Sequence, residues 1–483
     1  MRLSKYVCSV VAVLSPGANA FYPYVKTSIK IPSNGRLESR FFPYHIDSET
    51  VNGDGDVLSV PLKKISKLTT RENQYHITES NAPTFPDSAA IGIGGDDLSY
   101  VISVGVGSQN QTLWMLLDTG GLSTWVFSSD CTAEPCTVHS TFDADKSTSL
   151  KENGSDFTIH YGTGTVSGVT VTDDISFAGL KLRIPIGLAA EASADFMNYP
   201  MDGIFGLGRS NSSGEKEGTT FMDAAAKEGL FKRNIVGINL HRLSDDSKDG
   251  EVTFGDIDKS KFTGDISYTK VTSDVDKWEI PVGGVSVDGE KIDLPNKLAL
   301  IDTGTSFIFL PPDDATALHA LIKGSEKAGD TFLIPCDCKQ DVAFEFSGIS
   351  YSVSPKDYVG EQVGDNKCRS NIIGVQTDGP DDWLLGATFL KNVYAVFDYD
   401  EDQIGFARQT DAPEPKPATT TVAASASLPT AAAAKGSDTD SDSSSSGEKD
   451  TSSNSPHSDG AFTLPIPWTV LASLGSLCLS LVL

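Results

Sequence analysis

The strongest constraint on this chain of 483 residues is a short motif that occurs twice. Residues 116–120 read Leu-Leu-Asp-Thr-Gly, and residues 300–304 read Leu-Ile-Asp-Thr-Gly. Two apolar residues and a glycine follow each aspartate, 88 and 84 residues later, at 204–206 and 384–386. A motif that is repeated together with its spacing indicates an internal duplication. The sequence therefore predicts two similar halves, each of which brings one carboxylate to a tight turn at the end of a buried strand.

A pair of facing carboxyl groups has a definite chemistry. Two such groups cannot both ionise when they are close together, so they share one proton and titrate as a unit. The ionised group can take a proton from a water molecule, and the protonated group can donate to the oxygen of a peptide carbonyl. A glycine after each threonine permits a tight turn, and the threonine hydroxyls can brace the two turns. This chemistry requires no metal ion, no cofactor and no covalent intermediate.

The residues around the two motifs resemble those of the pepsin-like aspartic proteases, from about residue 98 to residue 409. The matching segments are Trp-Val at 125–126, a flap-like Tyr-Gly-Thr-Gly at 161–164, a bracing strand at 202–208, and closing strands of the second lobe at 396–398 and 404–407. The resemblance implies a mainly β, bilobal, pepsin-like fold, in which the active-site cleft lies between two antiparallel β-rich lobes.

The same resemblance implies roles for individual residues. Asp118 and Asp302 are expected to be catalytic. Support for the dyad and the flap is expected from Tyr161, Gly162, Thr163, Trp125, Thr119, Gly120, Thr303, Gly304 and Thr305. One position departs from the family, because Gly121 stands where a Ser or Thr usually bonds to the first aspartate. We expect the charged form of Asp118 to be less stabilised as a result.

Other catalytic chemistries find little support in the sequence. The chain contains no Gly-x-Ser-x-Gly elbow and no His-Glu-x-x-His pair, and its seven histidines do not show ligand spacing. We therefore expect no metal site. One alternative from a different functional class stays open: a catalytically weak or inactive cell-wall mannoprotein or binding module with the pepsin fold. Gly121 is its only support.

The pattern of apolar residues agrees with a β-rich protein. Short alternating runs such as 100–106 and 157–161 predict strands, and they are separated by clusters of Gly, Asn, Asp and Ser. Helices are expected at 221–229 and 313–323. By analogy with the family, we place the protease domain at 91–410, with lobes of about 91–283 and 284–410.

The N-terminal part of the chain has the features of a signal peptide and a propeptide. Residues 1–20 combine early positive charge, an apolar stretch and a final Ala-Asn-Ala, which is typical of a secretory signal. Residues 21–71 carry eight Lys/Arg against five Asp/Glu in a chain of net charge −27. A basic segment before an acidic body indicates an inhibitory propeptide, for which a flexible linker is the alternative. We place it at 21–90, with the mature N-terminus somewhere within 65–97.

The C-terminal part predicts an anchored surface protein. Residues 411–460 are rich in Ser, Thr, Ala and Pro and predict an unfolded stalk. The tail at 461–483 is apolar and ends without a basic flank, which reads as a glycosylphosphatidylinositol (GPI) signal with attachment at Asn454 or Ser458. The sequons at Asn110, Asn153 and Asn211 predict N-glycosylation and agree with a secretory route.

The cysteines agree with an oxidising compartment. The resemblance implies a disulfide between Cys131 and Cys136 and another between Cys336 and Cys368. Cys338 has no assigned partner. It could compete with Cys336 for Cys368 or remain a free thiol.

The whole layout resembles the fungal, GPI-anchored aspartic proteases of the yapsin type. We expect a monomeric endopeptidase, made as a zymogen, on the extracellular face of the cell membrane or in the cell wall. It would hydrolyse proteins or peptides at acidic pH. Its partners would be these substrates and the membrane, and nucleic acid is not among them. The cleavage-site preference stays open.

Overall fold

The computed structural model describes residues 72–410, apart from residue 96 and the segments 211–219, 246–247 and 273–276. The predicted signal peptide, stalk and anchor signal, Asn211, Asn454 and Ser458 lie outside the described residues, as does the propeptide up to residue 71. None of the described helices is long and apolar enough to cross a membrane.

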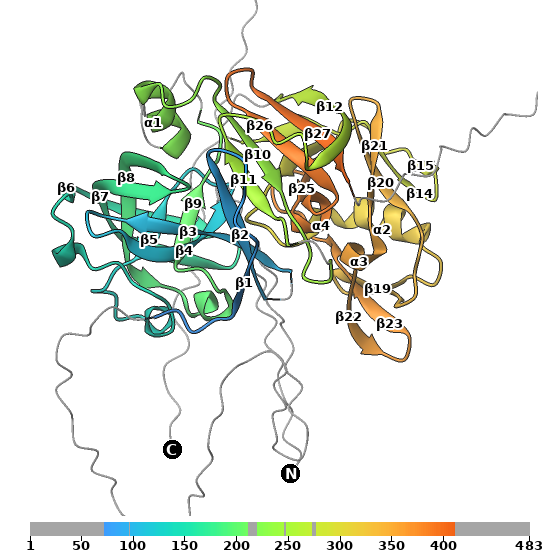
Figure 1. The fold of residues 1–483 in the computed structure, drawn as a ribbon. Helices are drawn as coiled ribbons and strands as arrows, with labels where there is room; N and C mark the ends of the chain where they lie inside the picture. Colours follow the sequence, from blue (N-terminus) through green and yellow to red (C-terminus); the bar gives the residue numbers. More distant parts are fainter. Residues whose placement is uncertain (1–71, 96, 211–219, 246–247, 273–276, 411–483) are drawn as a thin grey trace, which may run out of the picture. The chain divides into compact units, whose positions relative to one another are not determined.

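The described part of the chain is mainly β-sheet, which confirms the predicted fold class. Its largest sheet has fourteen strands (Figure 1). In spatial order these are β12 (Phe262–Lys270), β27 (Gln403–Gln409), β26 (Val393–Asp398), β10 (Ile235–Asn239), β11 (Glu251–Phe254), β2 (Ser88–Gly94), β3 (Ser99–Val106), β4 (Gln111–Asp118), β9 (Gly203–Gly206), β5 (Trp125–Phe127), β8 (Leu180–Ala192), β7 (Gly164–Phe177) and β6 (Lys151–Tyr161), with β1 (Ile77–Glu79) beside β2.

Three smaller sheets are built from the second half of the chain. The five-stranded sheet has the order β13 (Glu279–Pro281), β16 (Leu298–Ile301), β25 (Asp382–Leu385), β17 (Ile308–Leu310) and β24 (Ile372–Gly374). One four-stranded sheet has the order β15 (Glu290–Ile292), β14 (Gly284–Val287), β20 (Val342–Phe346) and β21 (Ile349–Val353). The other has the order β18 (Glu326–Ala328), β19 (Thr331–Pro335), β23 (Lys367–Ser370) and β22 (Val359–Gly364).

Strand β8 shows why these sequences form sheets. Leu180, Leu182 and Ile184 point inward and are buried, whereas the intervening Lys181 and Arg183 are exposed. This period of two is the side-chain period of a strand with one buried face. Strands β26 and β27 contain the segments that were expected to be closing strands of the second lobe, and they pair with each other. They also pair with β10 and β12, so the largest sheet contains strands from both halves of the chain (Figure 1).

The duplication read from the sequence is visible in the strand register. Strand β4 runs parallel to β9, and β16 runs parallel to β25. In both pairs, the residue two before the aspartate lies opposite the residue two before the glycine: Leu116 faces Ile204, and Leu300 faces Leu384. Each second strand then pairs antiparallel with the strand that follows the Asp-Thr-Gly turn, β5 in the first half and β17 in the second. The matched spacing of 88 and 84 residues therefore reflects the same three-strand unit in each half.

The glycines of the following motifs are needed for close packing. A Cβ atom at Gly206 would lie 2.5 Å from the backbone of Leu122, and one at Gly386 would lie 2.2 Å from the carbonyl oxygen of Thr305. No side chain fits at these distances. Each glycine therefore lets its strand lie directly against the segment that follows the Asp-Thr-Gly turn.

The described helices are short: α1 (Phe221–Glu228), α2 (Pro312–Ala320), α3 (Pro355–Tyr358) and α4 (Ala387–Leu390), with 3₁₀ turns at Glu134–Thr137, Ala144–Lys146 and Ala194–Asn198. Helix α1 matches the expected segment, because Thr220 and Asp223 form a capping box and Gly229 ends it in a left-handed conformation. The prediction for 313–323 was wrong at its C-terminal end. The chain there tightens into i→i+3 bonds from Leu321 to Leu318 and from Ile322 to His319, so α2 ends at Ala320.

A buried ionic cluster joins the segment after β10 to α3 and α4. The Asp357 carboxylate accepts hydrogen bonds from Arg242, with the Nη2 atom at 2.7 Å, and from Asn392 Nδ2 at 2.9 Å. Lys391 Nζ lies 3.1 Å from the same carboxylate, and Asp245 pairs with the outer side of Arg242. The side chains of Arg242, Lys391 and Asp357 are 6%, 6% and 0% exposed. This buried ionic cluster therefore links segments that are far apart in the sequence.

The N-terminal segment of the described chain is part of the folded body. Strand β1 pairs with β2, and β2 lies between β11 and β3. Before β1, the side chain of Asn73 donates to Asp202 Oδ1 at 2.7 Å. The propeptide boundary at residue 90 stays a prediction, as does the lobe boundary near residue 283. A cut after residue 90 would divide β2.

Candidate active site

The two aspartates of the repeated motif meet at the ends of their strands. Asp118 is the last residue of β4, and Asp302 directly follows β16; they are 1% and 0% exposed. The backbone N–H of Gly120 donates to Asp118 Oδ1 at 2.9 Å and to Asp302 Oδ1 at 3.1 Å. One donor thus bridges both carboxyl groups. The structure places side by side two carboxyls that are 184 residues apart in the sequence.

The two threonines hold the turns against each other. The backbone N–H of Thr119 donates to Thr303 Oγ1 at 3.1 Å, and that of Thr303 donates to Thr119 Oγ1 at 3.0 Å. Each hydroxyl in turn donates across to the other half: Thr119 Oγ1 to the carbonyl of Ile301 at 2.9 Å, and Thr303 Oγ1 to that of Leu117 at 2.8 Å. Both threonines are fully buried. This reciprocal exchange fixes the distance between the two carboxyls.

The second carboxyl has more donors than the first. Gly304 N–H donates to Asp302 Oδ1 at 2.8 Å, and Thr305 Oγ1 donates to Asp302 Oδ2 at 2.5 Å. In contrast, the Oδ2 atom of Asp118 is buried without a hydrogen-bond partner in the described part of the chain. The corresponding position of the first half is Gly121, which has no hydroxyl to offer. The two carboxyls are therefore held in unequal surroundings.

Electrostatics favour a shared proton. Burial, the negative charge of Asp302 and a hydrogen bond to Asp302 raise the pKa of Asp118 well above its ordinary value. Burial also raises the pKa of Asp302, but the hydrogen bonds from Thr305 and Gly304 oppose that rise. A pair with one proton and one negative charge can activate a water molecule and protonate a carbonyl oxygen.

Tyr161 lies beside this pair, at the end of the β6–β7 hairpin, where it pairs with Gly164 across the turn of Gly162 and Thr163. Trp125 Nε1 donates to its hydroxyl at 2.7 Å, and both side chains are buried. Burial and the charge of Asp118 raise the pKa of Tyr161 well above its usual range, so the phenol stays protonated. The structure therefore brings the predicted Tyr161 and Trp125 together next to Asp118.

Trp278 and Tyr399 also support the turn at Asp118, although they lie far from it along the chain, and the sequence did not reveal them. The backbone N–H of Leu207 donates to the carbonyl of Asp118 at 2.7 Å. The carbonyl of Leu207 accepts from Trp278 Nε1 at 3.0 Å and from the hydroxyl of Tyr399 at 2.6 Å. An isolated Trp and an isolated Tyr carry no local pattern that predicts such contacts, so no signal in the sequence identifies them.

Both predicted disulfides are present, between Cys131 and Cys136 and between Cys336 and Cys368. Cys338 is a free, half-buried thiol whose sulfur lies 3.4 Å from the hydroxyl of Tyr358. The question left open by the sequence is thus answered in favour of Cys336.

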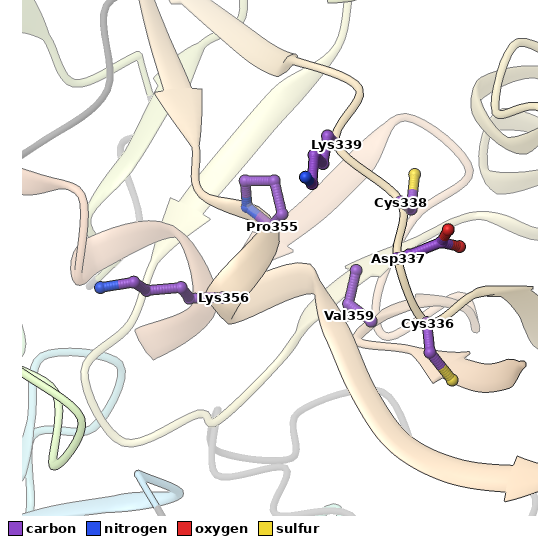
Figure 2. A pocket seen from close by; sticks show the side chains of 7 residues that line it. All are labelled: Cys336, Asp337, Cys338, Lys339, Pro355, Lys356 and Val359. Carbon is purple, nitrogen blue, oxygen red and sulfur yellow. The ribbon is translucent and has the colours of Figure 1, made fainter.

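Cys338 lines a surface pocket with Cys336, Asp337, Lys339, Pro355, Lys356 and Val359 (Figure 2). In this view the sulfurs of Cys336 and Cys338 point in different directions. None of the residues that line the pocket is a hydrogen-bond partner of Asp118 or Asp302. The pocket is therefore separate from the paired carboxyls.

The predicted glycosylation sites can be placed only in part. Asn110 is exposed in the turn between β3 and β4 with a φ of 53°, and Asn153 lies in β6. Within the described residues, no group of three or more His, Cys, Asp or Glu side chains could hold a metal ion.

Comparison with known proteins agrees with this geometry. Residues 99–409 match the family described as eukaryotic aspartyl protease. The chain is 45% identical over 421 residues to the aspartic-type endopeptidase ctsD of Aspergillus fumigatus, covering 85% of this chain and 88% of that protein. It is 30% identical over 338 residues to major aspartyl peptidase 1 of Cryptococcus neoformans, covering 65% and 69%. It is also 30% identical over 319 residues to pepsin A of Bos taurus, covering 64% and 84%.

Proposed function

The chain belongs to the eukaryotic aspartyl protease family and is an aspartic-type endopeptidase, and from this premise we propose that Asp118 and Asp302 form its catalytic dyad. The observation that carries the proposal is the pair of buried carboxyls bridged by the Gly120 N–H and braced by the Thr119 and Thr303 exchange. The substrates of an endopeptidase are proteins or peptides.

The proposed reaction uses a water molecule as the nucleophile. The ionised carboxylate takes a proton from this water molecule, and the oxygen of the water forms a bond to the carbonyl carbon of the peptide. The protonated carboxyl donates its proton to the carbonyl oxygen, which gives a neutral tetrahedral diol. The diol then collapses as the C–N bond breaks, and a proton passes to the leaving nitrogen. Because the active state needs one proton on the pair, we propose a bell-shaped activity profile on the acidic side of neutrality.

Tyr161 is proposed to act from the β6–β7 hairpin as the flap residue over the substrate. Its support is the hydrogen bond from Trp125 and the edge-to-face contact with Phe196, whose ring centroid lies 6.0 Å away. Phe196 also packs edge-on against Trp125 at 5.7 Å. An aromatic side chain held on two sides keeps its position at low entropic cost when a substrate binds.

The test of the dyad is an assay of Asp118→Asn and Asp302→Asn beside wild type, with denatured protein as the substrate at acidic pH. Both variants should lose activity, and a matched change at the exposed Asp365, Asp365→Asn, should not. A peptide containing a statine hydroxyl should inhibit wild type, because it mimics the tetrahedral diol. Retained activity in either dyad variant, or loss of wild-type activity with a chelator, would refute the proposal. A wild-type chain that binds substrate without turnover would favour the alternative of an inactive binding module.

We further propose that the enzyme is made as a zymogen. The support is the basic composition of residues 21–71 before an acidic body. Carboxylates of the protease domain would pair with prosegment lysines near neutral pH and release them on protonation. Replacing Lys63, Lys64 and Lys67 with Gln should make the uncleaved precursor active at higher pH. A triple variant as latent as wild type would show that proteolytic processing alone controls activation.

The remaining part of the proposal concerns location. We propose a secreted, monomeric, GPI-anchored enzyme of the fungal cell surface, with the lipid attached at Asn454 or Ser458 after removal of the apolar tail. The support is the Ser- and Thr-rich composition of residues 411–460 and the apolar composition of residues 464–483. Phosphatidylinositol-specific phospholipase C should move the mature protein from the detergent phase to the aqueous phase. Mature protein that still contains residues 464–483 by mass spectrometry would contradict the anchor.

A further inference from the structure

The two halves of the active site differ at one equivalent position. Thr305 stands three residues after Asp302, and Gly121 stands three residues after Asp118. The Thr305 hydroxyl donates to Asp302 Oδ2, whereas Asp118 Oδ2 is buried without a partner among the described residues. A Cβ atom at Gly121 would lie 2.5 Å from Asp118 Oδ2. The carboxyl of Asp118 therefore occupies space that a side chain at position 121 would need.

Hydrogen bonding distinguishes the charged states of the two carboxyls. An ionised carboxylate only accepts hydrogen bonds, and each donor that reaches it favours the charged form. Asp302 accepts from Gly304 N–H, Thr305 Oγ1 and Gly120 N–H. For Asp118 the backbone N–H groups of Gly120 and Gly121 provide the stabilisation, and no hydroxyl does so.

The strongest electrostatic influences on the pair of carboxyls do not reverse this order. Each carboxyl acts on the pKa of the other, and the protonated Tyr161 interacts with Asp118. Among the described residues, no lysine, arginine or histidine is one of the strongest influences on the pKa of either carboxyl. The donors on the two catalytic turns are thus the main difference between the carboxyls.

We propose that Gly121 assigns the roles within the dyad: Asp118 keeps the shared proton and acts as the acid, and Asp302 carries the charge and acts as the base. Asp302 then takes the proton from the attacking water, and Asp118 gives its proton to the oxygen of the peptide carbonyl. Gly121 is a positioning residue, because it acts through Asp118. This inference rests on the proposed function of the dyad and adds the direction of its proton transfers.

The two roles predict different effects on the two limbs of the pH profile of kcat/KM. On the acidic limb, the base becomes protonated; on the alkaline limb, the acid loses its proton. Gly121→Ser offers a hydroxyl to Asp118, so the alkaline limb should move to lower pH. Thr305→Val keeps the shape but removes the donor from Asp302, so the acidic limb should move to higher pH. One hydrogen bond to a charged group corresponds to a shift of about one pH unit or more.

The opposite assignment predicts the crossed result. If Asp118 were the base, Gly121→Ser would move the acidic limb down and Thr305→Val would move the alkaline limb up. Gly121→Ala is the matched control, because it adds the Cβ atom near Asp118 without a hydroxyl. If Gly121→Ser does not fold, as judged by circular dichroism, the limb moved by Thr305→Val decides alone.

A second measurement identifies the protonated carboxyl directly. A diazoacetyl peptide reacts with an undissociated carboxyl: the carboxyl proton passes to the diazo carbon, dinitrogen leaves, and the carboxyl oxygen forms an ester with that carbon. Peptide mapping of the labelled wild-type enzyme by mass spectrometry should find the ester on Asp118. An ester on Asp302, or crossed limb shifts, would overturn the assignment. A wild-type enzyme without activity would instead refute the proposed function. The limbs of the pH profile could not be measured in that case, but the ester label would still show which carboxyl is protonated.

Discussion

Replacing Asp357 with Asn should destabilise the protein far more than removal of an exposed ion pair. The change keeps the shape of the side chain but removes its charge. Arg242 and Lys391 would then be two buried cations beside an amide whose NH₂ group cannot accept their hydrogen bonds. Of these two cations, only Arg242 would keep Asp245 as a carboxylate partner, and Asp245 also pairs with Lys356.

The size of the effect follows from the burial of the cluster. Removing one partner of a buried ion pair costs about 3–5 kcal/mol, because the remaining charge is left uncompensated. For a folded body of this size, each kcal/mol lowers Tm by about 2 °C. We therefore expect Tm of Asp357→Asn to fall by about 6–10 °C. The range of about 3–5 kcal/mol applies directly to Asp357, because its side chain is fully buried.

The assay is thermal unfolding of wild type and variant at pH 6 and at one scan rate. The matched control is Glu326→Gln, which breaks the pair with Lys367, where both side chains are about half exposed. An exposed pair contributes about 0–1 kcal/mol, so this control should stay within about 2 °C of wild type. If Asp357→Asn also unfolds within about 2 °C of wild type, the argument from desolvation is wrong.

Three other predictions concern the same described region. Burial raises the pKa of Asp357, but Lys391 and Arg242 together outweigh this effect and lower the pKa. The stabilisation by Asp357 is therefore present above the ordinary carboxyl pKa of about 4 and is lost as pH falls through the lower pKa of the folded state. The Tm difference between wild type and Asp357→Asn should hold from pH 7 to 4 and shrink below pH 4. Tyr161→Phe leaves the buried Trp125 Nε1 without an acceptor, so kcat/KM should fall by about tenfold or more, and an unchanged value would argue against the flap role. Replacing Cys336 and Cys368 with Ser opens a loop with a sequence separation of 32, which should lower the free energy of unfolding by about 4 kcal/mol in urea titrations; an unchanged midpoint would contradict this.

The sequence predicted the centre of the site because the relevant information is local and repeated. A buried strand, an Asp-Thr-Gly turn and a distant apolar pair with glycine define one three-strand unit, and the unit occurs twice. The register of β4 with β9 and of β16 with β25 agrees with this interpretation residue by residue. The departure from the family at Gly121 was also visible in the sequence. The structure was needed to show that the Asp118 Oδ2 atom is buried without a partner among the described residues and lies beside position 121.

The supports of the site could not be predicted in the same way. Trp278 and Tyr399 contact the carbonyl of Leu207 across 71 and 192 residues. A side-chain hydrogen bond of that range depends on how whole sheets pack, and no periodicity or motif encodes it. The end of α2 was missed for a related reason, since the apolar pattern continues through Leu321 and Ile322 after the α-helical hydrogen bonds stop.

The reciprocal hydrogen bonds of Thr119 and Thr303 also have a consequence for newly synthesised, partly folded molecules. Each catalytic turn obtains hydrogen bonds from the other half, so neither turn is complete in a chain in which only one half has folded. Such an intermediate does not hold the carboxyls of Asp118 and Asp302 side by side, so they cannot share a proton. A partly folded molecule therefore cannot digest its neighbours during synthesis, when exposed, unfolded segments make them most vulnerable to cleavage. Under the proposed function, the carboxyl pair forms only when both halves have folded and met, before any activation of the zymogen.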